Sequence, residues 1–440
     1  MKILLGAIVA LGALGCSSDE NPSPTGAGGS AGGSSAAAGG SSTANAGSGA
    51  LGGTGGSGGS ADPSTAGAAG LPATYQLTLN VDGEGTVTSI PAGIECGERC
   101  TGSFPAGTHV QLEATAEGGA LTGWAEACSG GSSCSVTLDA DARVTATFEP
   151  FRAGGANAHG IAVTPDGTRA LVTLANSSGM LQVLSLADGS LLDSIPVGSF
   201  PSAVAVTPDG TKAVVNNLST VSVVTLATKA VATVASPCAS DTLYDVAVAP
   251  DGESAVTTMF NGNCVTNSVA VIALGTASMQ NQYSIPAQLS AGIAVTPDGT
   301  SALVALGILS TKVSRVALSG GAITDITNTS SSFGIAVTPD GSEALIASGD
   351  GDTIKRVSLG SNAVTGSIDY ASNQDPHNIA VTPDGTRAVA VGSFDVAVLL
   401  LSSGTVSKTF SGGGRSVAIT RDGKRALVTL GSDVRVFALP

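Results

Sequence analysis

A short motif that occurs seven times constrains the fold of this 440-residue chain more than any other feature. The first copy runs from Ile161 to Thr173 and reads IAVTPDGTRALVT. Four short strands with their turns fill about 40–45 residues, which is the length of one β-propeller blade. The sequence therefore predicts an all-β fold with a seven-bladed β-propeller over residues 150–440. The turn aspartate recurs at intervals of 43, 42, 47, 42, 44 and 38 residues, as Asp166, Asp209, Asp251, Asp298, Asp340, Asp384 and Asp422.

The residue types in the motif suit a tight turn between two buried strands. Proline presets φ at the first central position of a type I turn, aspartate suits the second, and glycine accepts the positive φ that follows. Because only 3% of residues are aromatic while 42% are hydrophobic, we expect blade cores of Val, Ala, Leu and Ile. Arg421 replaces the proline in the last copy and Ala249 replaces the threonine in the third. Both copies keep Asp and Gly, so we expect the turn in both.

The two ends of the repeat region predict how the ring closes. The last copy ends after a third strand, Val434–Phe437, and a short segment, Glu149–Gly154, precedes the first copy. We expect this segment to supply the outer strand of the last blade, because an open ring would leave an exposed sheet edge.

The residues after each motif continue the strand pattern. A third strand, such as Leu181–Leu186, is followed by a polar turn and a fourth strand, such as Leu191–Ile195. Over residues 152–440 this pattern resembles the YVTN-type, lactonase-like repeats of bacterial β-propellers. The resemblance implies the fold but no single function, since its members include enzymes, binding proteins and many of unknown role. The catalytic residues of lactonase-like relatives match no motif here, so none is carried over.

Residues 74–149 form a different unit, in which apolar and polar residues alternate at strand period, for example over Tyr75–Val81. This stretch resembles the divergent internalin-type B-repeat, a β-grasp-like module that serves bacterial surface proteins as a spacer or adhesion unit. The resemblance implies no catalytic residue. It is carried by Gly85-Thr-Val87, Pro91-Ala-Gly93-Ile94, Gly123-Trp124, Val144-Thr-Ala-Thr-Phe148 and the cysteines at 96, 100, 128 and 134.

The cysteine count supports an exported protein with disulfides. Of the seven cysteines, Cys16 is a candidate lipidation site, which leaves an even number. Short spacings predict one disulfide between Cys96 and Cys100 and another between Cys128 and Cys134. Zinc ligation by these four thiols is the alternative. A third disulfide, Cys238–Cys264, is expected because both residues flank one hairpin at the same end of the third blade.

The first 73 residues predict export and a flexible tether. Lys2 precedes a short apolar run that ends at Gly15, so residues 1–15 read as a signal peptide rather than a membrane span. The sequence Ala-Leu-Gly-Cys at 13–16 resembles a bacterial lipobox, and an ordinary secreted protein is the alternative. Residues 16–73 are rich in Gly, Ser and Ala and cannot bury enough apolar area to fold. We expect an exported, lipid-anchored protein of the cell envelope, at the outer membrane or cell surface, whose only membrane contact is the anchor.

Charge and motifs exclude several functions. The formal net charge of −15, from 18 basic and 33 acidic residues, argues against nucleic acid as a partner. The sequence contains no Gly-x-Ser-x-Gly elbow, phosphate-binding glycine loop or His-Glu-x-x-His helix. Asp350-Gly-Asp352 is similar to part of a calcium loop but lacks the remaining ligands. We therefore expect no cofactor and no metal.

The candidate site lies at the mouth of the propeller channel, opposite the Pro-Asp-Gly turns. Two residues before the apolar start of each inner strand stand His159, Ser202, Tyr244, Ala291, Phe333, His377 and Arg415. Polar groups that converge at such a mouth are a common place for a ligand. The candidate ligand-binding residues are His159, Tyr244, Asp245, His377 and Arg415, and the alternative is that they only line a wet funnel.

These observations favour a propeller that acts as a non-enzymatic binding or scaffold module for an unidentified protein or small-molecule ligand. One alternative is a lactonase- or lyase-like enzyme that acts on a small molecule in the funnel. Such an enzyme would need an acid/base pair within hydrogen-bond reach. A second alternative is an adhesion or spacer protein of the cell surface.

Overall fold

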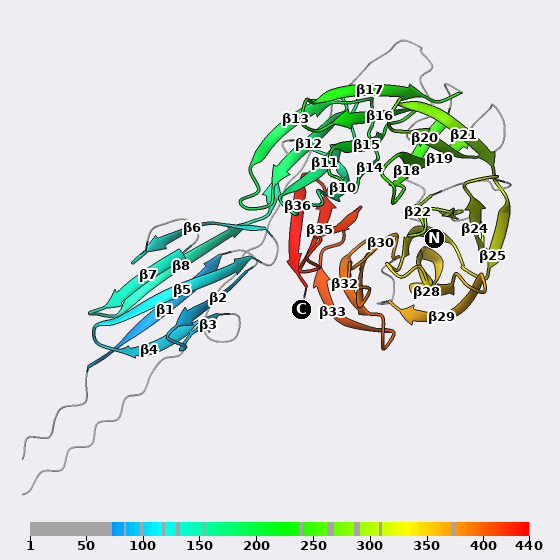
Figure 1. Cartoon of the computed structure of the whole chain (residues 1–440). Coiled ribbons are helices and arrows are strands. Elements are labelled where there is room, and N and C mark those ends of the chain that lie inside the picture. Colours follow the sequence, from blue (N-terminus) through cyan, green and yellow to red (C-terminus); the bar gives the residue numbers. More distant parts are fainter. Residues whose placement is uncertain are drawn as a thin grey trace, which may run out of the picture. The chain divides into compact units, whose positions relative to one another are not determined.

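The computed structural model describes residues 73–82, 85–96, 100–116, 119–128, 133–152, 155–237, 241–261, 268–285, 291–307, 310–370 and 375–439. It shows an all-β chain with a small N-terminal β domain followed by seven four-stranded sheets that form a seven-bladed propeller (Figure 1). The fold class predicted from the repeat is therefore confirmed. The signal peptide, the tether, Cys16 and the pair Cys238–Cys264 lie outside the described residues.

The N-terminal domain consists of two four-stranded sheets with the orders β4-β1-β8-β6 and β3-β2-β5-β7. The first and last strands, β1 and β8, pair in parallel. Alternating residues of each strand point into a core that contains Leu77, Val110 and the single tryptophan, Trp124. The strands are β1 (Thr74–Asp82), β2 (Gly85–Ile90), β3 (Glu95–Cys96), β4 (Thr101–Pro105), β5 (Thr108–Ala116), β6 (Ala120–Glu126), β7 (Ser133–Leu138) and β8 (Ala142–Glu149).

Two disulfides close short loops at the edge of this core. They join Cys96 to Cys100 and Cys128 to Cys134, in the pairs that the spacing predicted. Three of the four cysteines, all except Cys100, are among the buried residues of the core. The sulfur atoms thus bond to each other, as in an oxidising compartment, rather than forming the zinc site of the alternative reading.

The first four blades follow one another along the chain, each an antiparallel sheet from inner to outer strand. Blade 1 contains β10 (Ala158–Val163), β11 (Arg169–Leu174), β12 (Met180–Ser185) and β13 (Leu191–Pro196). Blade 2 contains β14 (Ala203–Val206), β15 (Lys212–Asn216), β16 (Thr220–Thr225) and β17 (Ala230–Ala235). Blade 3 contains β18 (Asp241–Val248), β19 (Ser254–Asn261), β20 (Ser268–Ala273) and β21 (Ser278–Ser284). Blade 4 contains β22 (Ile293–Val295), β23 (Ser301–Ala305), β24 (Lys312–Ala317) and β25 (Ile323–Thr327).

The remaining blades complete the ring. Blade 5 contains β26 (Ser332–Val337), β27 (Glu343–Ser348), β28 (Thr353–Ser358) and β29 (Ala363–Asp369), with a short 3-10 helix, η2 (Gly349–Gly351), between its second and third strands. Blade 6 contains β30 (Asn378–Val381), β31 (Arg387–Val391), β32 (Asp395–Leu400) and β33 (Thr405–Ser411). Blade 7 contains β34 (Val417–Ile419), β35 (Arg425–Leu430), β36 (Asp433–Ala438) and β9 (Phe151–Arg152).

The outer strand of blade 7 comes from the start of the propeller region. Phe151 and Arg152 of β9 pair antiparallel with Val434 and Asp433 of β36. In Figure 1 the red C-terminal blade accordingly lies beside the green first blade. The predicted closure of the ring is confirmed.

The cores lie between neighbouring blades and are aliphatic, as the composition predicted. Leu171 and Leu181 of blade 1, for example, pack with Val204 and Val215 of blade 2. The second strands are buried on both faces, and every residue of β23 is buried. Outer strands are mostly exposed, as the burial pattern of β13 shows. This difference explains why the first three strands of a blade are richer in apolar residues than the fourth.

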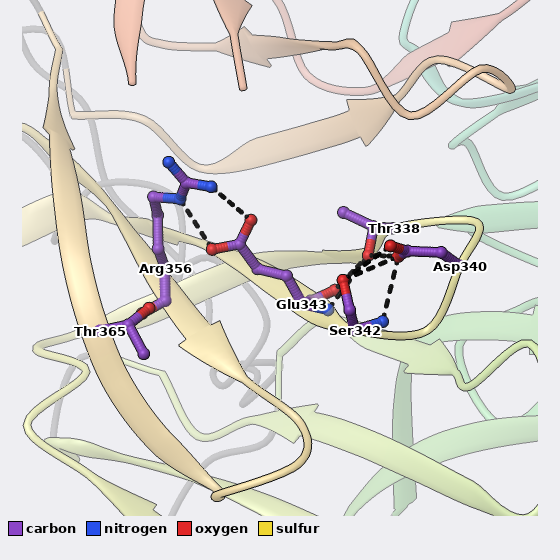
Figure 2. A network of polar contacts seen from close by, with 6 residues as sticks. All are labelled: Thr338, Asp340, Ser342, Glu343, Arg356 and Thr365. Atoms are coloured by element: carbon purple, nitrogen blue, oxygen red, sulfur yellow. Dashed lines mark hydrogen bonds and ion pairs between the residues drawn. The ribbon is translucent and has the colours of Figure 1, made fainter. Parts of the chain in front are cut away.

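In every copy except the third, which has Ala249 in place of the threonine, the turn is held by the same side-chain bonds, shown for blade 5 in Figure 2. The Thr338 hydroxyl donates to Asp340 Oδ1 at 2.6 Å, and the amide of Ser342 donates to the same oxygen at 3.0 Å. These bonds lower the pKa of Asp340 to about 2, the Thr338 bond contributing most. Beside the turn, Arg356 binds both carboxylate oxygens of Glu343, at 2.7 and 2.8 Å (Figure 2). The repeated aspartates are therefore turn-forming residues.

In blades 2 to 7 the glycine of the turn also lies against the proline of the preceding blade's turn. A methyl group placed on Gly210 would be in van der Waals contact with Pro165, at 3.4 Å, and the next blades repeat this arrangement. The series ends at blade 1, because Arg421 stands where blade 7 would have a proline. Among the described residues, nothing lies within 4 Å of a methyl group placed on Gly167. The turns of both exceptional copies nevertheless form, since Gly423 and Gly252 both have the expected positive φ.

Candidate functional site

The mouth face of the propeller is defined by the segments that precede the first strands and by the connections between second and third strands. In an antiparallel blade these segments lie at the same end, opposite the Pro-Asp-Gly turns. His159 lies in β10, and Tyr244 and Asp245 lie in β18. His377 directly precedes the inner strand β30, and Arg415 lies two residues before the inner strand β34. The structure therefore brings all five candidate residues to the mouth face.

Two histidines and an arginine share one electrostatic environment there. Burial lowers the pKa of His159, the hydrogen bond to the carbonyl oxygen of Ser202 opposes this shift, and the nearby Arg415 and His377 lower the pKa further. Residues of blades 6 and 7 thus act on an imidazole of blade 1.

The two imidazoles are used in contacts between blades. Nδ1 of His159 in blade 1 lies 2.7 Å from the carbonyl oxygen of Ser202 in blade 2. Nε2 of His377 in blade 6 lies 2.8 Å from the carbonyl oxygen of Gly414, at the start of blade 7. Among the described residues, no hydrogen bond links either imidazole to a carboxylate. The described contacts place both imidazoles against main-chain carbonyl oxygens of a neighbouring blade.

Asp245 likewise joins two blades. Its carboxylate accepts hydrogen bonds from the amide of Val246, at 2.9 Å, and from the amide of Ile293 in blade 4, at 3.0 Å. Its main-chain carbonyl oxygen accepts a bond from Asn216 in blade 2 at 2.8 Å. Burial raises the pKa of Asp245 to about 6 despite the two amide bonds. Asp245 is therefore a structural link between blades 2, 3 and 4.

The raised pKa of Asp245 makes a prediction about stability and pH. Because the folded protein holds this proton more tightly than the unfolded chain, whose value is near 3.8, the stabilisation is complete below pH 3.8 and is lost as the pH rises through about 6. We expect the melting temperature of the unmodified chain to fall between pH 5 and pH 7.5 relative to that of Asp245→Asn. Thermal unfolding of both proteins at the two pH values measures this difference. Parallel pH profiles for the two proteins would show that the carboxylate does not titrate in this window.

Tyr244 and Arg415 are exposed at the mouth face and available for contact. Tyr244 is 36% exposed, and its ring packs edge-to-face against Phe260, with 6.5 Å between ring centroids. Two further aromatic residues, Phe200 and Phe394, are exposed on the same face by 39% and 63%. The sequence reasoning missed both phenylalanines. Both lie close to the start of an expected strand in a chain with only nine phenylalanines, and this position could have marked them as candidate binding residues.

The opposite, turn face has a pocket of about 350 Å³ at the junction of blades 7 and 1. It lies where Arg421 replaces the proline and where Gly167 consequently has no proline against it. Arg425 also lines the pocket and donates to the carbonyl oxygen of Leu186 at 3.0 Å. The carboxylates at this site belong to turn aspartates that are already hydrogen bonded within their own turns.

In the part of the chain that the structure describes, no three His, Cys, Asp or Glu side chains gather into a metal-binding group. In the same part, no helix is long and apolar enough to cross a membrane.

The fold defines a seven-bladed propeller protein with an N-terminal β domain, and its mouth face exposes the aromatic side chains of Phe200, Tyr244 and Phe394. Residues 75–152 match the model of the divergent InlB B-repeat domain family. A solved structure of hydrazine synthase from Kuenenia stuttgartiensis is similar to 55% of this chain and 83% of that chain, with 18% identity and a TM-score of 0.50. At this identity the likeness shows the fold alone. No curated protein sequence matches the chain. The B-repeat domain and the disulfides suggest an extracellular or surface protein.

Proposed function

We propose that the chain is a cell-envelope lipoprotein, anchored at Cys16, whose YVTN-type propeller binds a macromolecular partner through the mouth face without catalysing a reaction. The predicted tether, residues 16–73, would hold the folded part away from the membrane, and a random coil of this length reaches roughly 40 Å. The B-repeat-like domain serves as a spacer between tether and propeller.

The observation that carries this proposal is the position of the exposed aromatic side chains. Among the described propeller residues, the large hydrophobic side chains that are exposed fall into two groups. The aromatic ones, Phe200, Tyr244 and Phe394, all belong to the mouth face. The aliphatic ones belong to the outer strands β13 and β17. Aromatic residues and arginine are enriched at binding interfaces, and Arg415 lies on the same face as the three rings.

The contacts of the histidines favour binding over catalysis. His159 and His377 use ring nitrogens to hold neighbouring blades together, and their partners are main-chain carbonyl oxygens. A ligand that withdrew these nitrogens would weaken the ring. Among the described contacts, the side chains of Tyr244, Phe394 and Arg415 form no hydrogen bond between blades, so we assign these side chains to the partner.

Site-specific photo-crosslinking in intact cells tests the proposal. A benzoylphenylalanine at position 394 replaces one exposed aromatic ring by another, and the same residue at position 192, on outer strand β13, is the matched control. We expect a discrete crosslinked species from position 394 only, and a loss of at least about tenfold when Arg415→Ala is added. Equal products from both positions, or none from position 394, would contradict a partner at the mouth face.

A further inference from the structure

The ring of Pro-Asp-Gly turns has one gap, between blades 7 and 1. In blades 2 to 7, the atom nearest to a methyl group placed on the turn glycine is Cδ of the proline in the preceding blade's turn, at 3.4–3.7 Å. Gly167 of blade 1 is the exception, because Arg421 stands at the proline position of blade 7. The turn-face pocket of about 350 Å³ lies at this gap.

The replacement of proline by arginine adds a main-chain donor to the pocket. Proline has no N–H, and its Cδ is bonded to the nitrogen where other residues carry the amide hydrogen. The turn of blade 7 keeps the geometry of the other turns, since Thr420 donates to Asp422 Oδ1 at 2.5 Å and Gly423 has a positive φ. The N–H of Arg421 therefore points toward Gly167, as Cδ does in the other copies. Among the described residues, this amide donates no hydrogen bond.

Two guanidinium groups add side-chain donors at the same place. Arg421 is exposed, and within the described part of the chain its side chain forms no hydrogen bond or ion pair. Arg425 is partly buried, and its Nη1 donates to the carbonyl oxygen of Leu186 at 3.0 Å, which fixes its position. A guanidinium has five N–H donors, so Arg425 keeps others for a ligand. Unpaired main-chain amides and guanidinium groups together suit a ligand with negatively charged oxygen atoms.

Two aspartates in the pocket restrict the charge of that ligand. Asp166 and Asp422 line the pocket, and hydrogen bonds within their own turns lower the pKa of both carboxyl groups, those from Thr164 and Thr420 contributing most. Both groups are therefore charged at neutral pH and offset the two arginines. A phosphate monoester carries a charge of about −1.5 to −2 at pH 7, so these aspartates repel it more strongly than they repel a carboxylate of charge −1.

We propose that this pocket binds the carboxylate of a small organic acid, whose oxygen atoms accept hydrogen bonds from the amide and guanidinium of Arg421 and from the guanidinium of Arg425. The volume is at the lower end of the range for small-molecule sites, roughly 300–1,000 Å³. Pro165 and Gly167 line the pocket without charge and provide a wall for the organic part of the ligand. The site lies on the turn face, so it is separate from the partner proposed for the mouth face.

Saturation-transfer difference NMR of the full chain at pH 7.5, with benzoate as the probe, tests the proposal. We expect a benzoate signal that saturates with concentration. Benzamide has the same shape without the charge and should bind at least about tenfold more weakly. Phenyl phosphate should also bind more weakly than benzoate, because of the two aspartates.

Arg421→Pro is the decisive variant, because it restores the motif of the other copies while removing both the amide and the guanidinium. We expect it to lose the benzoate signal and to melt no lower than the unmodified chain. Arg421→Ala keeps the amide, should weaken benzoate binding at least about fivefold, and provides the measurement if the proline variant does not fold. Arg415→Ala, at an exposed arginine of the mouth face, is the matched control and should leave benzoate binding unchanged.

Three results would overturn the proposal. The first is the absence of a benzoate signal from the unmodified chain, and the second is unchanged benzoate binding by the Arg421 variants. The third is tighter binding of phenyl phosphate than of benzoate, which would contradict a carboxylate as the ligand. Since Arg415 belongs to the mouth face, failure of the partner proposed there leaves each of these measurements unaffected.

Discussion

Deleting residues 431–440 is expected to unfold blades 7 and 1 together and to lower the melting temperature of the propeller by more than about 10 °C. The deletion removes β36, which lies between β35 and β9 in the sheet of blade 7. β35 would become an open edge, and Phe151 and Arg152 of β9 would lose their pairing partners. Differential scanning calorimetry of the full chain and the shortened chain measures the change.

The side chains of β36 explain why the damage would reach both neighbours. Val434 and Val436 are buried with Leu174 and Leu184 of blade 1. Phe437 points to the other side and packs in the cluster of blade 6, where its ring centroid lies 4.6 Å from that of Phe410. Each buried side chain of this size contributes about 1.5–3 kcal/mol, so the joint loss of three is comparable to the free energy of unfolding of a typical domain.

A deletion of equal length provides the control for this prediction. Removing residues 40–49 from the Gly-, Ser- and Ala-rich stretch takes away no large apolar side chain and should leave the melting temperature unchanged. If the chain without residues 431–440 melted like the full chain, then β36 would not close the ring, and blade 7 would be stable without it.

The architecture could be predicted from the sequence because its signals are local and repeated. The turn residues Pro, Asp and Gly fix a hairpin by their own backbone preferences, and seven copies fix the number of blades. The closure by β9 followed from counting strands in the last copy. The hairpin turns depend on neighbouring residues only, so contacts elsewhere in the chain do not change them.

The structural roles of the mouth residues could not be predicted from the sequence, because these roles depend on hydrogen bonds between blades. His159 and Asp245 occupy positions where a ligand is expected, yet their polar atoms bind Ser202 of blade 2 and Ile293 of blade 4. The pattern places a side chain at the mouth but does not reveal which neighbour satisfies it.

The inner strands of neighbouring blades approach each other closely. We therefore expect Gly334→Ala to cause the second large loss of stability. Gly334 lies in β26, and a methyl group placed there would come within 2.7 Å of Asn378 Cα and 2.8 Å of the His377 carbonyl oxygen in blade 6. Both neighbours are main-chain atoms, which cannot move aside as a flexible side chain could. We expect a loss of about 1–3 kcal/mol or more in the free energy of unfolding, measured by chemical denaturation. Motif alignment does not reveal this constraint, because blades 2 and 3 have Ala203 and Asp245 at the equivalent position.

Gly366→Ala in the outer strand of the same blade is the matched control. Nothing in the described structure lies within 4 Å of a methyl group placed on Gly366, and the strand position suits an alanine. Since alanine reduces the freedom of the unfolded chain, this change should be neutral or stabilising by up to about 1 kcal/mol. The two substitutions add the same atoms to one blade. Changes of opposite sign in the free energy of unfolding would therefore show that the steric constraint lies between the inner strands. Equal effects of the two substitutions on stability would instead mean that blade 5 can shift away from blade 6 at little cost in free energy. The inner strands of these blades would then be less tightly packed than the contacts of Gly334 indicate.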